Sequence, residues 1–249
     1  MIKVIPLLKD TEKELAVIQK IHPDEPDMIL TLESFGDMAR SNPELGFVRA
    51  KLLRRFGLDE SRFFQLEQVH SKDVSLSDEP DIMNKKGDGL IAAHTDHVLG
   101  VTVADCMPVF LFDRTKRKHA LVHSGWKGTG IAVEAVQKMK MRFDCKPADI
   151  TAVLGPSIRS CCYEVDEERG RLFEMLWGKD AVKWHEDSSG IRKPSLDLLK
   201  ANIDLLDKNG LTDIRVVEEC TACSEEFGSF RRQGPERFTH MLAIIGFFK

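Results

Sequence analysis

The sequence lacks any long apolar run. No stretch approaches the roughly 18 consecutive apolar residues that a membrane-spanning helix needs, and the opening MIKVIPLLKDTEKE becomes charged before it reaches the length of a secretory hydrophobic region. No segment is low in complexity, and no period of roughly 20 to 50 residues repeats itself, which argues against solenoids and propellers. The sequence therefore predicts a cytoplasmic protein with no membrane partner.

An excess of positive charge is also absent. The chain has 36 Lys and Arg against 40 Asp and Glu, a formal net charge of -4. Binding to a phosphate backbone requires a basic surface, so we expect no nucleic-acid partner. In a chain expected to stay in a reducing compartment, the six cysteines predict thiols or metal ligands rather than a disulfide framework.

What is present is an ordinary globular composition, with 42% hydrophobic and 31% charged residues. We expect one domain over 1–249, of which 1–60 is a divergent N-terminal part. Residues 1–60 look largely helical, and the run 45–58 places Phe47, Ala50 and Leu53 on one helical face, with either Leu52 or Phe56, before Gly57.

From residue 63 onward, short β-rich runs alternate with helical patterns. Pro108 cannot donate a ladder hydrogen bond, so we expect it to break or bulge the strand beside Cys106. Thr129 and Ser195 are predicted helix N-caps and Gly210 a helix end. The order predicts an α/β (α+β) sandwich with a mixed sheet and outer helices. Strands are predicted over 63–70, 87–93, 98–113, 119–123, 150–158, 213–219 and 241–248, and helices over 131–143, 165–176 and 195–211.

Three residues at strand ends or breaks could form a metal site. His70 and His123 end predicted strands beside small residues, and Cys106 lies between them in the sequence. Two imidazoles and one thiolate would leave the fourth tetrahedral position of a zinc ion open, as in catalytic zinc sites. The spacing matches no compact zinc signature, so the residues alone also allow two hydrogen-bonded histidines and a core cysteine.

The same residues also fit a cysteine hydrolase. Cys106 would be the nucleophile and His123 its base, with backbone N–H groups near Gly125 or Gly128 forming an oxyanion hole. His70 distinguishes the two hypotheses, because a zinc site requires a third ligand and a Cys–His pair does not.

Several segments together resemble the laccase-domain family. Its members are also described as multicopper polyphenol oxidases, purine nucleoside phosphorylases and peptidoglycan editing factors. The resemblance covers roughly residues 65 to 249 in the family's order. The segments are QVHS (68–71), GDGLIA (87–92), GVTVADCMPVFLFD (100–113), ALVHSGWKGTG (120–130), LGPSIRSCCYEV (154–165), LDLLKANIDLL (196–206), CT (220–221) and SFRR (229–232).

The resemblance implies a four-layer α/β/β/α fold and a zinc ion held by His70, Cys106 and His123. It further implies phosphorolysis of adenosine, inosine and methylthioadenosine, and deamination of adenosine, in which a zinc-activated water attacks C6. We expect zinc rather than Cu²⁺, because a lone His–Cys–His set lacks the ligand count of a multicopper cluster.

Cations for the incoming phosphate are expected from four side chains. Lys127 stands where the family usually has arginine, which loses the bidentate fork. Asp88 and Asp105 could orient ligands, move protons or cap turns. The phosphate-binding candidates are Arg231, Arg232, Arg49 and Lys127.

Other functions stay open. The leading alternative is an amidohydrolase acting on a peptidoglycan precursor, through zinc hydroxide or through the Cys106/His123 pair. A copper polyphenol oxidase and a non-enzymatic metal- or partner-binding module are further alternatives.

Four further cysteines and two histidines are predicted to lie outside the site. Cys161 and Cys162 are expected to pack in the interior. Cys220 and Cys223 form one C-x-x-C pair, and we expect no second pair to complete a zinc site with them. His94 and His97 are expected at the surface, and His119 could support His123 from the same face of its strand.

Overall fold

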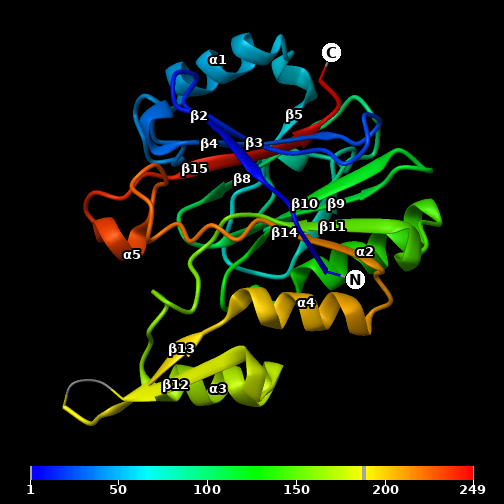
Figure 1. Ribbon diagram of the computed structural model, residues 1–249. Helices are drawn as coiled ribbons and strands as arrows, with labels where there is room; N and C mark the ends of the chain where they lie inside the picture. Colours follow the sequence, from blue (N-terminus) through cyan, green and yellow to red (C-terminus); the bar gives the residue numbers. More distant parts are fainter. Residues whose placement is uncertain (1, 187–188, 249) are drawn as a thin grey trace.

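The computed structural model describes residues 2–186 and 189–248. Two β-sheets lie face to face at its centre, with helices outside them (Figure 1). The first sheet has seven strands, in the order β1 (Ile2–Val4), β14 (Asp213–Val216), β11 (Ile150–Leu154), β9 (Met107–Asp113), β10 (Lys118–Ser124), β7 (Gly89–Ile91) and β6 (Val74–Leu76).

The second sheet has six strands, in the order β2 (Leu7–Asp10), β3 (Leu15–Ile18), β4 (Asp27–Thr31), β15 (Met241–Gly246), β8 (Val98–Val103) and β5 (Phe63–Phe64). Both sheets contain parallel and antiparallel pairs, as in β11 with β14 and β11 with β9, and β5 with β8 and β15 with β8. The prediction of mixed sheets is confirmed.

The helices cover the outer faces of the sheets. In Figure 1, α1 (Leu45–Phe56) lies beyond the second sheet, and α2 (Ile131–Phe143) and α4 (Leu198–Lys208) lie beyond the first. A hairpin of β12 (Val182–Glu186) and β13 (Arg192–Leu196) packs with α3 (Glu167–Trp177) below α4. The remaining helices are α5 (Phe230–Gln233) and the short 3-10 helices Glu33–Phe35, Glu60–Arg62, Ile82–Asn84, Pro147–Asp149 and Lys179–Ala181.

Three hydrophobic clusters fill the spaces between these four layers. One packs α2 and α4 against the first sheet, through residues such as Met139 and Val122. The second lies between the sheets and includes Phe110 and Leu99. The third packs α1 on the second sheet, through Leu52. Three buried interfaces between helix, sheet, sheet and helix make the fold the expected α/β/β/α sandwich.

The prediction for residues 1–60 is wrong. The segment 2–31 contributes β1 to the first sheet and β2, β3 and β4 to the second, and only α1 is a full α-helix there. These strands are three to five residues long and are joined by charged turns, so their period-two pattern is too short to be distinctive. Two of them pair with distant strands, β1 with β14 and β4 with β15, about two hundred residues away in the sequence.

The helix expected at 45–58 is present as α1, and Gly57 ends it with the positive φ of 59° that glycine accommodates without strain. Its buried face agrees with the predicted one at Leu52 and Leu53 but not at Phe47. Val48, Leu52 and Leu53 are buried, whereas Phe47 is 70% exposed.

Other local expectations are also corrected. The N-cap of α2 is Gly130, because the Thr129 hydroxyl donates to the carbonyl of Gly125 instead. The N-cap of α4 is Asp197, whose carboxylate accepts from the N–H of Lys200, rather than Ser195. The hairpin β12–β13 was not predicted.

The run 98–113 forms two strands that belong to different sheets. β8 lies in the second sheet and β9 in the first. Pro108 does not break the strand, since it pairs within β9 opposite His123. The chain turns instead at Asp105, which has a φ of 85°. Cys106 therefore lies where the chain passes from one sheet to the other.

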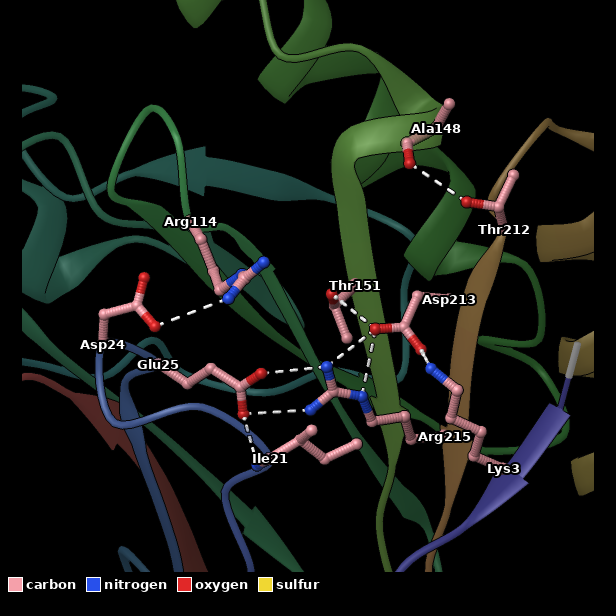
Figure 2. Close-up of polar contacts among 10 residues, drawn as sticks. All are labelled: Lys3, Ile21, Asp24, Glu25, Arg114, Ala148, Thr151, Thr212, Asp213 and Arg215. Atoms are coloured by element: carbon pink, nitrogen blue, oxygen red, sulfur yellow. Dashed lines mark hydrogen bonds and ion pairs between the residues drawn. The ribbon is translucent and has the colours of Figure 1, made fainter.

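A buried ion pair ties the N-terminal segment to the first sheet (Figure 2). Arg215 of β14 is 2% exposed and donates two hydrogen bonds of 2.9 Å to the carboxylate of Glu25, which is fully buried. Arg215 also contacts Asp213 at 2.7 Å, and Asp213 accepts from Thr151 and Lys3 (Figure 2). Separating Arg215 from Glu25 would leave a buried charge uncompensated, which is costly in free energy. The network therefore holds the loop before β4 against the first sheet.

Among the described residues, the helices are all too short or too polar to cross a membrane.

Candidate metal centre and cavity

His70, Cys106 and His123 come together from three separate parts of the chain. His70 lies in the loop after β5, Cys106 in the β8–β9 connection and His123 in β10. Each offers one ligand atom, and these atoms all lie within 4.8 Å of one another. The two imidazole rings are edge to face, with centroids 5.0 Å apart. The arrangement can hold a metal ion.

The backbone around the three side chains is unusual. His70 has a φ of 58°, so it occupies a turn rather than the predicted strand end. Gly125 is required beside Cys106, because a Cβ at this position would lie 2.8 Å from the Cys106 Sγ. A Cβ on Gly128 would lie 3.3 Å from the carbonyl oxygens of His123 and Ser71. Glycines in the turn after β10 thus allow it to pack closely on the cluster.

Asp88 links the loop of His70 to His123. One carboxylate oxygen lies 2.9 Å from His123 Nδ1 and accepts from the His70 N–H at 3.1 Å. The other accepts from the N–H groups of Val69 and Ser71 at 3.2 and 2.6 Å, and from the Ser71 hydroxyl. Because Nδ1 of His123 is held by Asp88, Nε2 is the ring nitrogen left for a metal.

The electrostatics of the cluster favour charged forms. Burial opposes the Cys106 thiolate, but the charge of His123 and hydrogen bonds from both histidines outweigh it and lower the pKa of Cys106 to about 6. Burial likewise disfavours protonated His123, yet Cys106 and Asp88 raise the pKa of His123 to about 9. For Asp88, hydrogen bonds from His123 and Ser71 overcome burial and lower its pKa to about 2.

These residues fit a divalent metal ion. A metal requires a deprotonated thiol and neutral imidazoles, and a cation among the three would favour the thiolate and displace the proton from His123. Asp88 supplies the carboxylate partner that a metal-binding histidine usually has. Three protein ligands fall one short of a closed tetrahedral site.

The cluster opens into a cavity of about 780 Å³. Its volume is within the range of small-molecule sites, roughly 300 to 1,000 Å³. The wall combines cationic, acidic and aromatic side chains. Besides the three cluster residues, it includes Arg40, Gln65, Glu67, Gln68, Asp105, Trp126, Tyr163, Arg169, Phe230, Arg231, Phe238 and His240.

The four predicted phosphate-binding residues lie in different surroundings. Arg231 lines the cavity, and its guanidinium donates to the carbonyl of Glu164. Arg232 points away, donating to the carbonyls of Thr221, Ser224 and Phe227. Arg49 is behind the wall, bonded to the side chain of Gln65 at 2.8 Å. Lys127 is exposed beside Trp126 and is not part of the lining.

Two further arginines in the wall were missed from the sequence. Arg40 and Arg169 both line the cavity. Arg169 lies over the ring of Trp126, 4.9 Å from its centroid, and contacts Asp166 at 3.6 Å. No motif signals them: Arg40 lies in the segment misread as helical, and Arg169 belongs to a helix whose sequence shows no sign of facing a site.

Asp105 joins the β8–β9 connection to the C-terminal part of the chain. Its carboxylate accepts from the Thr221 hydroxyl and from the N–H of Arg231, both at 2.7 Å. The Asp105 carbonyl accepts from the N–H of Ile158 at 2.9 Å. Asp105 therefore positions the residue after it, Cys106, relative to Arg231.

The predictions for the other cysteines are wrong. Cys161 is exposed and Cys162 only partly buried. Together with Cys220 and Cys223 they form a second group whose sulfur atoms all lie within 4.8 Å of one another. Cys161 and Cys162 thus provide the second pair of cysteines that was not expected from the sequence. They are adjacent in the sequence, and adjacent cysteines do not match a common metal-binding spacing.

His94, His97 and His119 lie away from the cluster, whereas His240 lines the cavity. His94 is exposed and His97 partly buried. His119 is fully buried at the other end of β10, where its Nε2 lies 2.9 Å from the carbonyl oxygen of His97. Burial lowers the pKa of His119 to about 4. His119 is outside the cavity lining, so it does not touch the site.

Two sheets between helical layers, with a His–Cys–His cluster opening into a polar and aromatic cavity, define an α/β/β/α sandwich with a candidate metal centre. The family model described as multi-copper polyphenol oxidoreductase laccase matches residues 44–247. The chain belongs to this family.

Relatives in the family carry the name of an enzyme. The purine nucleoside phosphorylase of Clostridium acetobutylicum is 37% identical over 173 residues, covering 68% of this chain and 70% of that protein. That of Borreliella burgdorferi is 31% identical, covering 90% of this chain and 94% of that protein. A human purine nucleoside phosphorylase is 30% identical, and the match covers 83% of this chain and 50% of the human protein.

Solved structures share the fold. YlmD from Geobacillus stearothermophilus superposes with a TM-score of 0.82 at 27% identity, covering 94% of this chain and 96% of that one. The hypothetical protein YfiH from Bacillus licheniformis gives a TM-score of 0.82 at 25% identity, covering 94% and 97%.

Proposed function

We propose that the chain is a zinc-dependent purine nucleoside enzyme, which cleaves adenosine, inosine and methylthioadenosine with phosphate and deaminates adenosine. The observation that supports it best is the composition of the cavity into which His70, Cys106 and His123 open. Its wall carries arginines and aromatic rings together, the groups that recognise a phosphate and a purine respectively. The relatives' name, purine nucleoside phosphorylase, supports a purine nucleoside and phosphate as the substrate class.

In phosphorolysis, a phosphate oxygen forms a bond to C1′ of the ribose, the C1′–N9 bond breaks, and the base takes up a proton. The chain's residues would bind and orient the two reactants. Arg231, Arg169 and Arg40 supply cations for the phosphate, which guanidinium groups bind with charge-assisted hydrogen bonds. Trp126, Tyr163, Phe230 and Phe238 supply faces and edges against which a purine ring can pack.

In deamination, water adds at C6 of adenosine and ammonia leaves, which gives inosine. When bound by His70, Cys106 and His123, zinc would supply Lewis acidity to the cavity. Asp88 would hold the ring of His123 in one tautomer and fix the turn of His70. Asp105 would hold the backbone of Arg231 at a fixed position relative to the neighbouring Cys106.

The test is incubation of the purified protein with adenosine, with and without phosphate. We expect adenine and ribose 1-phosphate only when phosphate is present, and inosine with ammonia in either case. Removal of zinc by a chelator should stop both reactions, and added zinc should restore them. A zinc-loaded protein that forms none of these products would contradict the proposal.

One observation favours a second candidate, an amidohydrolase with Cys106 as nucleophile. His123 lies beside Cys106 and its other ring nitrogen contacts Asp88, which is the order of a nucleophile–base–acid set. Chelation separates the two functions: a nucleophilic cysteine would keep its activity without metal and lose it on alkylation.

The proposal includes a cytoplasmic location and no nucleic-acid partner. This part of the proposal rests on the six cysteines, which are interpreted as thiols or metal ligands of a protein in a reducing compartment, and on the net charge of -4.

A further inference from the structure

The second cysteine group lies away from the cavity. Cys161 and Cys162 follow β11, and Cys220 and Cys223 follow β14, the parallel neighbour of β11 in the first sheet. Of the described residues that line the cavity, none is one of these four cysteines. Their role is therefore separate from the proposed reaction.

Backbone pairing continues beyond the two strands and brings the cysteines together. Ser157 and Cys220 form a parallel bridge, in which the Thr221 N–H donates to the carbonyl of Ser157 at 3.2 Å. Two tight turns then bring the thiols toward one another: the N–H of Cys162 donates to the carbonyl of Arg159, and that of Cys223 to the carbonyl of Cys220.

The sulfur spacing matches a tetrahedral metal site. Cys161 and Cys162 Sγ are 3.8 Å apart, and Cys223 Sγ lies 3.7 Å from the first and 3.3 Å from the second. Four sulfurs bound to zinc at about 2.3 Å would be about 3.8 Å apart along a tetrahedral edge. The Cys220–Cys223 pair also has the C-x-x-C spacing common in structural zinc sites.

The surroundings suit a negatively charged cluster. Four thiolates around one divalent ion carry a net charge of two minus. The N–H of Arg159 donates to Cys220 Sγ at 3.4 Å, and the guanidinium of Arg159 interacts electrostatically with the same residue. Hydrogen bonds and cations of this kind support metal-bound sulfur.

We propose that Cys161, Cys162, Cys220 and Cys223 form a second metal site, which holds one zinc ion through four thiolates. With all four positions filled by protein, its role is structural rather than catalytic. It joins the loop that carries Tyr163, part of the cavity wall, to the loop that carries Thr221, the partner of Asp105. The site does not depend on the proposed function.

The first test is the zinc content of the full chain purified under reducing conditions. We expect two zinc ions per chain in the parent and one in Cys106→Ala, which retains the four-cysteine site. The double variant Cys220→Ser/Cys223→Ser should also hold one. Cys145→Ala is the matched control, since Cys145 is buried in the core outside both groups, and should hold two. A Cys106→Ala protein without zinc would overturn the proposal.

A second measurement needs no variant at these positions. The parent protein is treated with a thiol-alkylating reagent before and after chelation, and the modified cysteines are identified by mass spectrometry. We expect the four cysteines to be protected until zinc is removed. Equal alkylation with and without zinc would overturn the proposal, as would an intact mass lower by two hydrogens, which would indicate a disulfide instead. Failure of either test leaves the pocket metal, and thus the proposed function, unaffected.

A Cys106→Ala protein loaded with Co²⁺ gives a spectroscopic check. Tetrahedral thiolate coordination produces thiolate-to-cobalt charge-transfer absorption, whose intensity rises with the number of thiolates. We expect the intensity of a four-thiolate site. Absence of the band would overturn the assignment.

Discussion

The two groups of metal-ligating side chains differ in number of ligands, in location and in what surrounds them. The pocket group has three ligands from three separate loops and strands, and it faces a cavity of about 780 Å³. The cysteine group has four ligands on two neighbouring loops and lies outside the cavity. On the two proposals, the number of ligands and their access to a cavity distinguish a reactive metal site from a structural one.

Loss of the pocket thiol should give the largest effect. Cys106→Ala is expected to lose the pocket zinc and to lower phosphorolysis by more than about 100-fold, because a residue that only orients a ligand already contributes roughly 10–100-fold. The melting temperature should also fall, because zinc bound in the pocket stabilises the folded state by the same linkage as any other ligand. Steady-state kinetics and calorimetry on this variant and on Cys145→Ala measure both. Retained turnover in a Cys106→Ala protein whose pocket holds no zinc would contradict the assignment of the reaction to the pocket group.

Loss of the cysteine site should act chiefly on stability. A ligand present at a thousandfold excess over its dissociation constant stabilises the folded state by about 4 kcal/mol. For a domain of this size, Cys220→Ser/Cys223→Ser should lower the melting temperature by on the order of 10 °C. Phosphorolysis below the transition should fall far less than in Cys106→Ala. An unchanged melting temperature in a zinc-loaded buffer would contradict this expectation.

Asp88→Asn tests the residue that orients the pocket ligands. The amide keeps the size of the side chain but loses the charge and half of its acceptor capacity, so zinc affinity and activity should each fall by roughly 10–100-fold. Competition with a chromogenic chelator measures the affinity. The cysteine site should retain its zinc in the same sample; release from both sites would show that Asp88 acts on the fold as a whole.

The ion-pair network at Arg215 provides a stability reference outside both groups. Burial opposes the charge of Asp213, but hydrogen bonds from Arg215 and Lys3 lower its pKa from 3.8 to about 2. This stabilisation is present above pH of about 4 and is lost as the pH falls toward 2. Asp213→Asn should therefore cost about 2 kcal/mol at pH 7. Denaturant unfolding of the parent and the variant at pH 7 and near pH 2 measures this difference in the free energy of unfolding, which should disappear in acid. Zinc analysis at pH 7 should give the same metal content for both proteins.

Arg231→Gln should act mainly on phosphate binding. Loss of one charge-assisted contact is worth about 1.5–3 kcal/mol, so the KM for phosphate should rise by about tenfold or more, with a smaller change in kcat. Lys127→Gln is the control, because Lys127 is exposed and outside the cavity. Equal effects of the two substitutions would argue against phosphate binding at Arg231.

Much of the fold is predictable because α2 and the strands from β7 to β11 carry strong local patterns. Helix 131–143 matches α2 residue for residue. The strands of residues 2–31 are not predictable, since their burial depends on β14 and β15 near the other end of the chain. The break at Asp105 was wrongly assigned to Pro108, because a positive φ at an aspartate leaves no mark in the sequence.

The sites show the same limit. His70, Cys106 and His123 were singled out by their places in the sequence, and their convergence is a property of the two packed sheets. Arg40 and Arg169 reach the cavity from elements whose own sequences show no sign of it. The cysteine site escaped notice because adjacent cysteines match no ligand spacing, and parallel pairing of β11 and β14 is what brings them to the C-x-x-C pair.

The crossing of the chain between sheets makes the interior of the sandwich a determinant of metal geometry. Cys106 moves with both β8 and β9, whereas His123 is fixed in the first sheet alone. A sideways slip of one sheet over the other would change the separation of thiol and imidazole. Tight packing of residues such as Phe110 between the sheets therefore fixes the distance between the Cys106 thiol and the His123 imidazole, so a change in the core would also change the geometry of the proposed metal site.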